Sequence, residues 1–396
     1  MSTATAAPSS RPYWLGLDKL GVLIAAIAAA GTVLPFALFR ANRIVPGEAR
    51  GILEALPPAE GAVLLAVLVG GIVAALLRLP RRVKLGAATL ALVALAVMIG
   101  RSAEFLTPPE NTFARVSPGA GFWLLVFAFA LLLADCLTRL RLQPWLRIAV
   151  LAGVALAMAA WLWSGAWNDL ALLKEYSTRA AAFWNEGRTH LALAFGSVAA
   201  AIAVGVPLGV LCFKVKPLRA SVLGVLNIIQ TVPSIALFGL LIAPLAWVAA
   251  TVPGAARLGI SGIGAAPALV ALFAYALLPI VSNTLVGLLG VPAAAVDAAR
   301  GMGMTARQRL LGIQFPLAFP VILTGIRIVL VQNIGLATIA ALIGGGGFGV
   351  FVFQGIGQTA MDLVLLGAIP TVALAFAAAV VLDALIEMSG GRGRPA

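Results

Sequence analysis

The chain has 396 residues, of which 62% are hydrophobic and only 10% are charged. A soluble domain cannot bury that much apolar surface, so the composition excludes a soluble globular protein and indicates a polytopic membrane protein. The formal net charge of +13 would suggest a nucleic-acid partner in a soluble chain, but here the basic residues lie in short segments between apolar runs, where they set topology and contact anionic lipid headgroups.

Ten apolar runs are long enough to cross a bilayer, for which about 20 residues are needed. The third is short, and the seventh is long enough to be tilted or broken. We expect the spans at 20–39, 61–77, 85–100, 121–137, 148–164, 191–213, 221–248, 265–289, 317–342 and 361–387. The predicted fold is therefore an all-α polytopic membrane protein with about ten transmembrane helices.

The basic residues predict the orientation of these spans. Most of the 27 Lys and Arg residues fall in the N-terminus and in every second segment after it, whereas the acidic residues concentrate in the others. Basic segments stay on the cytosolic side of a membrane. We therefore expect both termini to be cytosolic, including a tail at 389–396, and the segment after the eighth span to face the cytosol as well.

The first half of the chain, residues 1–163, is predicted to form a bundle of about five transmembrane helices. Asp135 lies in its fourth span, but Arg139 follows four residues later, which favours an ion pair over a functional acid. Residues 164–190 are amphipathic and rich in interfacial aromatic residues, so we expect an external linker there or a contact for a partner. His190, at the start of the next span, is expected to act as a cap at headgroup level.

A polar, basic island interrupts the apolar second half between Asp297 and Pro316. Pro292 suits the first turn of a short helix, and the glycines that follow the acid end it. Thr305 with Gln308 three residues later forms a capping box, which starts a second helix at once. We expect that helix to end near Pro316, giving two short helices at an elbow outside the lipid.

This island resembles the EAA loop of ABC importer permeases. The sequence Asp297-Ala298-Ala299 is followed at the family's spacing by Gly303, Ile313, Phe315 and Pro316, with Asp in place of Glu and Phe in place of Leu. The resemblance implies that residues 291–316 are the coupling loop that docks into a cytosolic ATPase. It assigns this coupling role to Asp297, Ala298, Ala299, Gly303, Ile313 and Pro316.

Residues 191–388 are similar to the minimal five-span core of type I ABC importer permeases, and residues 230–234 to the osmoprotectant branch. Pro233 must kink or end a helix, and Gln230, Thr231 and Ser234 can satisfy the backbone carbonyls that it frees. The segment is either a gate in the translocation pathway or an ordinary proline kink.

The run at 340–351 also resembles the osmoprotectant branch, in a region near the outer mouth of the pathway. Gly344 and Gly346 are candidate pathway residues there; the dinucleotide-binding interpretation of this glycine pattern fails because no strand precedes it. Asn333 is a further pathway candidate, as a lone amide in an apolar span. For Arg327 in the same span we favour a structural ion pair over contact with substrate.

The resemblance implies a permease subunit of the bacterial inner membrane that translocates glycine betaine, choline or a similar quaternary amine. The implied partners are a cytosolic ABC ATPase dimer, a second permease subunit that is identical or different, an extracytoplasmic solute-binding protein and membrane lipid, with no nucleic acid. We expect no catalytic residues, no metal and no cofactor in this chain, since ATP and Mg would be used by the ATPase. Two alternatives remain open: a permease for an amino acid such as methionine, and an ion-coupled secondary transporter.

Overall fold

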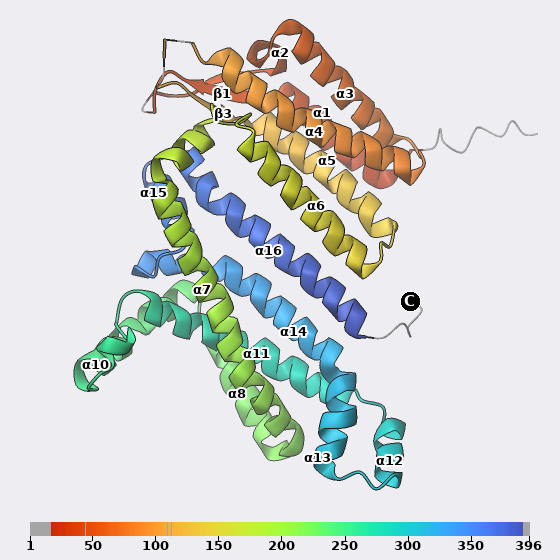
Figure 1. The fold of residues 1–396 in the computed structure, drawn as a ribbon, viewed down its shortest axis with the longest axis vertical. Helices are drawn as coiled ribbons and strands as arrows, with labels where there is room; N and C mark the ends of the chain where they lie inside the picture. Colours follow the sequence, from red (N-terminus) through yellow and green to blue (C-terminus); the bar gives the residue numbers. More distant parts are fainter. Residues whose placement is uncertain (1–16, 44, 109, 112, 391–396) are drawn as a thin grey trace, which may run out of the picture. The chain divides into compact units, whose positions relative to one another are not determined.

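The structure is a computed structural model that describes residues 17–43, 45–108, 110–111 and 113–390, and these fall into two compact units. The first unit extends to Gln143 and also includes Ala155–Lys174. The second consists of Pro144–Val154 and of the chain from Glu175 onward. Figure 1 shows that each unit is built mainly from long helices.

The first unit is a helical bundle with a small sheet at one end. Its helices are α1 Lys19–Val33, α2 Ile52–Ala55, α3 Pro58–Leu76, α4 Arg81–Leu106, α5 Ala120–Arg139 and the latter part of α6 Pro144–Trp163. Its core is a single cluster of aliphatic and aromatic side chains from α1, α3, α4 and α5. The short third span that the sequence predicted is a helix of 26 residues, long enough to cross a membrane.

The sheet was not predicted. Strands β1 Ala37–Arg40, β2 Glu48–Arg50 and β3 Arg115–Pro118 are antiparallel in the order β2-β1-β3. The first predicted span continued to residue 39, but α1 ends at Val33 because Leu34, which precedes a proline, is extended. The apolar residues that follow belong to β1, so hydrophobicity alone could not separate the helix from the strand.

The second unit contains the remaining helices. They are α7 Ala171–Lys214, α8 Lys216–Thr231, α9 Ser234–Leu240, α10 Ile242–Thr251, α11 Ala265–Leu289, α12 Ala293–Gly301, α13 Ala306–Arg309, α14 Phe315–Leu336, α15 Gly349–Gly357 and α16 Met361–Ser389. Counting α9 with α10, and α13 with α14, as single spans, the described part of the chain has nine helical segments long and apolar enough to cross a membrane. With the shorter apolar helix α1, this agrees with the predicted fold of about ten transmembrane helices.

Two predicted segments have a different helical structure. The seventh span is divided into α8, α9 and α10, of which α10 projects from the rest of its unit (Figure 1). The predicted linker at 164–190 runs into the sixth span, because α7 is continuous except for one non-helical residue, Arg179. The domain boundaries at 163 and 190 stay predictions.

Close approach of α11 and α14 forms the centre of the second unit. A Cβ on Gly325 of α14 would lie 3.0 Å from the backbone oxygen of Pro279 and 2.8 Å from the Cβ of Asn283, both in α11. Small residues are the usual means of bringing helices together inside a membrane, where the hydrophobic effect gives no preference for helix over lipid. The two helices thus pack closely at the centre of the unit, and the elbow joins the end of α11 to the start of α14.

Candidate functional site

The elbow between α11 and α14 begins with α12, whose end is determined by Gly303. The N–H of Met304 donates to the oxygen of Ala299 at 3.1 Å, and the N–H of Gly303 donates to the oxygen of Arg300 at 2.9 Å. This pair of bonds is a Schellman motif, and Gly303 has the left-handed φ, +78°, that the motif needs. A Cβ here would meet no atom within 4 Å, so backbone conformation and not crowding requires glycine.

The capping box predicted at the start of the second elbow helix is confirmed. The N–H of Gln308 donates to Oγ1 of Thr305 at 3.3 Å, and the N–H of Thr305 donates to Oε1 of Gln308 at 2.8 Å. The prediction that this helix ends near Pro316 is wrong. α13 continues through a π-helical turn at Leu310–Gln314 into α14, and this wider turn directly precedes the proline, which has no N–H to donate.

The residues assigned to coupling differ in their exposure. Asp297, Ala298, Gly303 and Pro316 are exposed, Ile313 is half-buried and Ala299 is wholly buried. Asp297 lies 4.0 Å from Arg300, but both side chains are about two-thirds exposed, so this pair is weak. The acid is therefore available to another molecule, whereas Ala299 is part of the elbow's own interior.

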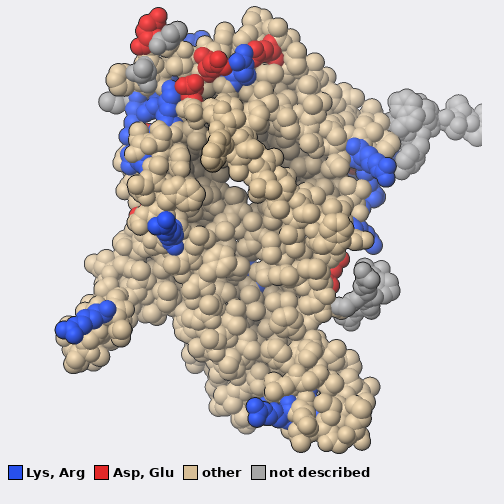
Figure 2. Space-filling view, in the orientation of Figure 1, with Lys and Arg blue, Asp and Glu red and all other residues tan. Residues whose placement is uncertain are grey.

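A shallow open hollow of about 510 Å³ lies on the elbow. It is lined by Met304, Thr305, Arg307, Gln308, Leu311 and Gly312. Leu311 is 57% exposed at its rim. Basic side chains are visible at the end of the second unit formed by α8, α12 and α13 (Figure 2). The elbow thus presents apolar and basic groups together, as a protein-docking surface does.

The break between α8 and α9 is held by α11. Pro233 separates the two helices, and Ser234 is the first residue of α9. The hydroxyl of Tyr275 in α11 donates a short hydrogen bond to the backbone oxygen of Val232. Nε2 of Gln230 donates back to the oxygen of Tyr275 at 2.9 Å. These two bonds fix the broken segment against a neighbouring helix.

Thr231, in contrast, is hydrogen-bonded within its own helix, where its Oγ1 donates to the oxygen of Ile228 at 2.7 Å. Tyr275 is not among the residues that the sequence predicts to satisfy the freed carbonyls, which are Gln230, Thr231 and Ser234. The sequence feature that could have identified Tyr275 is that it is the only tyrosine in an apolar span. Its hydroxyl needs a hydrogen-bond partner when it is away from water.

Asn333 lies in the core of the second unit. It is wholly buried, and its Nδ2 donates to Oγ of Ser197 in α7 at 2.8 Å and to the oxygen of Leu272 in α11 at 3.2 Å. The amide therefore joins three helices. Its assignment to the pathway stays a prediction, and it would require this core to open.

Three of four successive glycines after α14 have left-handed backbones. The φ angles are +74° for Gly344, +75° for Gly346 and +87° for Gly347. Residues with a Cβ rarely adopt these angles. We call residues 344–348 the glycine segment; it joins the short helical turn Ile339–Ile343 to α15.

Comparison with known proteins gives a consistent result for both halves of the chain. Residues 201–392 match the model of the binding-protein-dependent transport system inner membrane component. The osmoprotectant import permease protein OsmW of Salmonella typhimurium is 43% identical over 198 residues, which are 50% of this chain and 85% of that protein. The chain belongs to the permease family of ABC importers.

Two further relatives match the permease over a similar extent. The carnitine transport permease protein OpuCB of Listeria monocytogenes is 40% identical over 47% of this chain and 78% of that protein. The choline transport system permease protein OpuBB of Bacillus subtilis is 35% identical over 52% of this chain and 86% of that protein. Residues 18–173 match a separate model, the N-terminal domain of the ABC transporter permease YehY.

Arg327 in α14 is part of an ion-pair network, as predicted. Its Nη1 lies 2.9 Å from Oδ1 of Asp383 in α16. The other oxygen of Asp383 lies 3.3 Å from Arg147, which also lies 2.7 Å from Oε2 of Glu387. Asp383 thus connects α14 with the first turns of α6, the part that belongs to the second unit.

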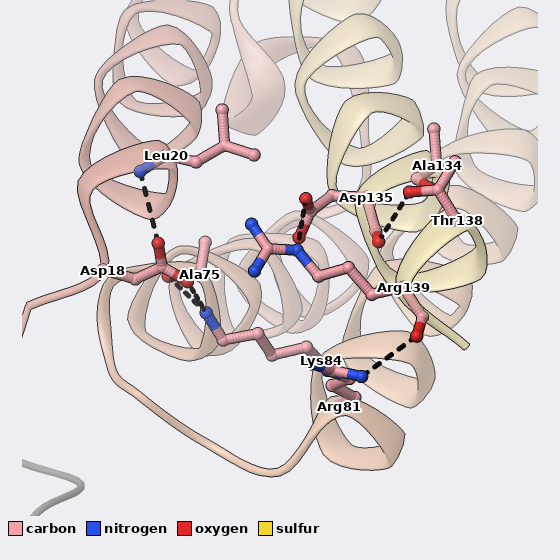
Figure 3. A network of polar contacts seen from close by, with 9 residues as sticks. All are labelled: Asp18, Leu20, Ala75, Arg81, Lys84, Ala134, Asp135, Thr138 and Arg139. Carbon is pink, nitrogen blue, oxygen red and sulfur yellow. Dashed lines mark hydrogen bonds and ion pairs between the residues drawn. The ribbon is translucent and has the colours of Figure 1, made fainter. Parts of the chain in front are cut away.

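The first unit of the permease has its own polar network at one end (Figure 3). Asp135 and Arg139 form the predicted ion pair, at 2.7 Å. Nζ of Lys84, a buried side chain, lies 2.7 Å from Oδ2 of Asp18 and donates to the oxygen of Ala75 at 3.1 Å. The hydrogen bond that Lys84 donates to the carboxylate of Asp18 holds the pKa of Asp18 below its usual value. The network ties the start of α1 to α3 and α4.

The prediction for His190 is wrong. Its side chain is wholly buried, with its ring 5.1 Å from that of Phe348, so it does not cap the helix at headgroup level. The helix containing it begins some twenty residues earlier than expected, at Ala171. His190 therefore lies inside the helix, against the glycine segment.

Proposed function

We propose that this permease imports an osmoprotectant with a quaternary ammonium group, such as glycine betaine, choline or carnitine. The observation that supports this is the relationship to OsmW, at 43% identity over 85% of its length. The names of OpuCB and OpuBB give carnitine and choline for those proteins. These compounds share a methylated cationic nitrogen, so relatives with different named substrates agree on one chemical class.

The elbow is the proposed contact with the ATPase. Membership of the family implies an ATPase and a substrate-binding protein as partners. Asp297 and Ala298 are exposed on α12, and the hollow on α13 provides apolar surface beside basic groups. The charge pattern of the sequence supports a cytosolic position for the elbow and for both termini. In this proposal ATP and Mg are used by the ATPase dimer, and this chain has no catalytic site.

The continuity from α13 into α14 gives the elbow a mechanical path into the membrane. A helical run from Ala306 to Leu336 contains only the π turn as an irregularity. Arg327 and Asn333 on this run contact α16, α7 and α11. A movement of the elbow would therefore displace side chains that contact three other helices. It would reach them through continuous helix and not through a flexible loop. A second permease subunit, identical or different, would complete the pathway.

Transport by the reconstituted complex tests the proposal. The permease, its ATPase and its binding protein are placed in liposomes, and ATP-dependent uptake of radiolabelled glycine betaine, choline and carnitine is compared with uptake of methionine. We expect uptake of at least one quaternary amine, competition by the others and no effect of an ionophore. ATP-dependent uptake of methionine alone would overturn the substrate class. Uptake that is abolished by the ionophore and is independent of ATP would overturn the mechanism.

A further inference from the structure

The N-terminal half of α7 lies between the two regions that match known families. The N-terminal model ends at residue 173 and the transport model begins at residue 201. Between them the chain is helical and belongs, from Glu175, to the second unit. Its contacts therefore show how this permease connects the segment to its transport core.

One face of this helix lies against the glycine segment and α15. Phe183, Glu186, Gly187 and His190 have the spacing that places residues on one side of a helix. The ring of Phe183 is 5.2 Å from that of Phe348, and a Cβ on Gly187 would be 3.1 Å from the same ring. Aromatic contacts thus fix the position of α7 on both sides of Glu186.

Glu186 makes the polar contact at the centre of this face. Its Oε2 accepts a hydrogen bond from the backbone N–H of Gly347 at 2.6 Å. A bond to an ionised carboxylate is stronger than one between neutral groups. A Cβ on Gly346 would lie 2.8 Å from the same oxygen, so glycine at this position leaves room for the carboxylate. The two partners are 161 residues apart in sequence.

The segment held by Glu186 follows the helical run that starts at the elbow. α14 leads through Ile339–Ile343 into the glycine segment, and the segment leads into α15. A displacement of α14 relative to α7 therefore stretches the bond between Glu186 and Gly347 unless the backbone between α14 and Gly347 changes conformation. The left-handed glycines before it are the positions at which the backbone can change conformation most easily.

We propose that Glu186 is a positioning residue that latches the glycine segment to α7, and that release of this latch is a step of the transport cycle. The second part rests on the proposed function; the first does not. With the latch closed, the carboxylate selects one conformation of the glycine segment. When α14 moves, the bond breaks and the glycine segment rearranges, while the ring of Phe183, 6.2 Å from that of Phe351 in α15, keeps α7 in place.

The experiment compares three variants of the full-length permease, in nanodiscs with its ATPase. Glu186→Ala removes the acceptor, and Glu186→Gln retains a neutral carbonyl acceptor of the same length. Arg188→Ala, an exposed residue on the same turn, is the control for a charge change. Amide hydrogen exchange is measured for the peptide covering residues 342–350.

We expect Glu186→Ala to raise exchange of the Gly347 amide by about tenfold or more, the factor that corresponds to loss of one charge-assisted hydrogen bond. Glu186→Gln should restore most of the protection, and Arg188→Ala should leave it unchanged. Equal exchange in Glu186→Ala and the unaltered protein would overturn the latch. So would equal loss of protection in Glu186→Gln and Glu186→Ala.

Uptake kinetics test the role of the latch in transport. We expect Glu186→Ala to lower the maximal uptake rate by about fivefold, with KM changed by less than about twofold, because binding of substrate is not altered. Glu186→Gln should transport at nearly the normal rate. Unchanged transport despite increased exchange would overturn the role in the cycle. Failure of the unaltered protein to take up any quaternary amine would instead overturn the proposed function, and the exchange result would still stand.

Discussion

Gly301 and Gly303 lie two residues apart at the end of α12, but only Gly303 has a left-handed backbone. Replacing Gly303 with Ala should cost about 1–2 kcal/mol locally, because a Cβ opposes this conformation. The Schellman motif then opens and the direction of the elbow changes. We expect ATP-dependent uptake to fall strongly while the amount of protein in the membrane stays normal, as measured by transport assay and immunoblot.

Gly301→Ala is the matched control for this prediction. Gly301 is the last residue of α12, its backbone is not left-handed, and a Cβ there meets no atom within 4 Å. Alanine is favoured over glycine in a helix, so this variant should transport normally. Equal loss of uptake in both variants would show that the elbow needs small surfaces rather than the motif.

The Asp18–Lys84 pair predicts a pH dependence for the stability of the first unit. A carboxyl whose folded pKa is lowered contributes stability above its unfolded pKa of about 3.9, and loses it as the pH falls through the folded pKa. We expect the thermal unfolding temperature in detergent to decrease as the pH falls below about 4. Asp18→Asn should flatten that dependence and destabilise the unit at pH 7 by roughly 2–4 kcal/mol, because buried Lys84 loses its counter-charge.

Asp135→Asn is the control for the buried pair. Arg139, the partner of Asp135, is 51% exposed, so removal of this ion pair should cost only about 0.5 kcal/mol. Tryptophan fluorescence during thermal unfolding measures both variants. If Asp135→Asn destabilised the unit as much as Asp18→Asn, burial of Lys84 would not be the reason for the difference.

At the scale of elements, Pro233 and Pro207 provide a contrast between a proline that breaks a helix and one that does not. Pro233 separates α8 from α9, whereas α7 continues through Pro207. Pro233→Ala supplies the missing N–H and removes the ring, so α8 and α9 can join. We expect the variant to bind its ATPase normally but to lose most of its uptake, since Tyr275 can no longer hold the carbonyl of Val232. Pro207→Ala should have a small effect in the same transport assay.

The elements that the sequence predicted correctly are those determined by local patterns. Length and hydropathy located the long helices, and the spacing of Thr305 and Gln308 located the start of α13. The elements that it missed depend on distant partners. β1 exists because β2 and β3 pair with it on either side, and its first three residues are as apolar as those of the preceding helix.

The same distinction applies to the candidate site. Gly303 could be recognised from its local motif. Tyr275 contacts Val232 from 43 residues away, and Glu186 contacts Gly347 from 161 residues away, so no short pattern in the sequence contains either pair. Polar residues in apolar surroundings can be recognised as important, but their partners become visible only when the helices are placed side by side.

For the whole molecule, the helical run that starts at the elbow contacts other helices at two positions, Arg327 and Asn333. Arg327 on α14 contacts Asp383 on α16, which also contacts Arg147 on α6. Further along, Asn333 contacts α7 and α11. Force applied at the elbow therefore reaches the first turns of α6, a helix within the N-terminal family region, through side chains of the second unit.

Charge reversal tests this connection. Arg147→Glu places an acid beside Asp383 and Glu387, so it should lower the unfolding temperature and slow uptake. Adding Glu387→Arg recreates an ion pair between positions 147 and 387 with the charges exchanged. The double variant should therefore recover part of the unfolding temperature and part of the uptake rate. These side chains are 29–52% exposed, so the coupling energy from a double-mutant cycle should be about 0.5–1 kcal/mol.

The exposed pair Asp297–Arg300 at 4.0 Å should give no measurable coupling in the same kind of cycle. Strictly additive effects of Arg147→Glu and Glu387→Arg would mean that the contact does not transmit force between α6 and α16.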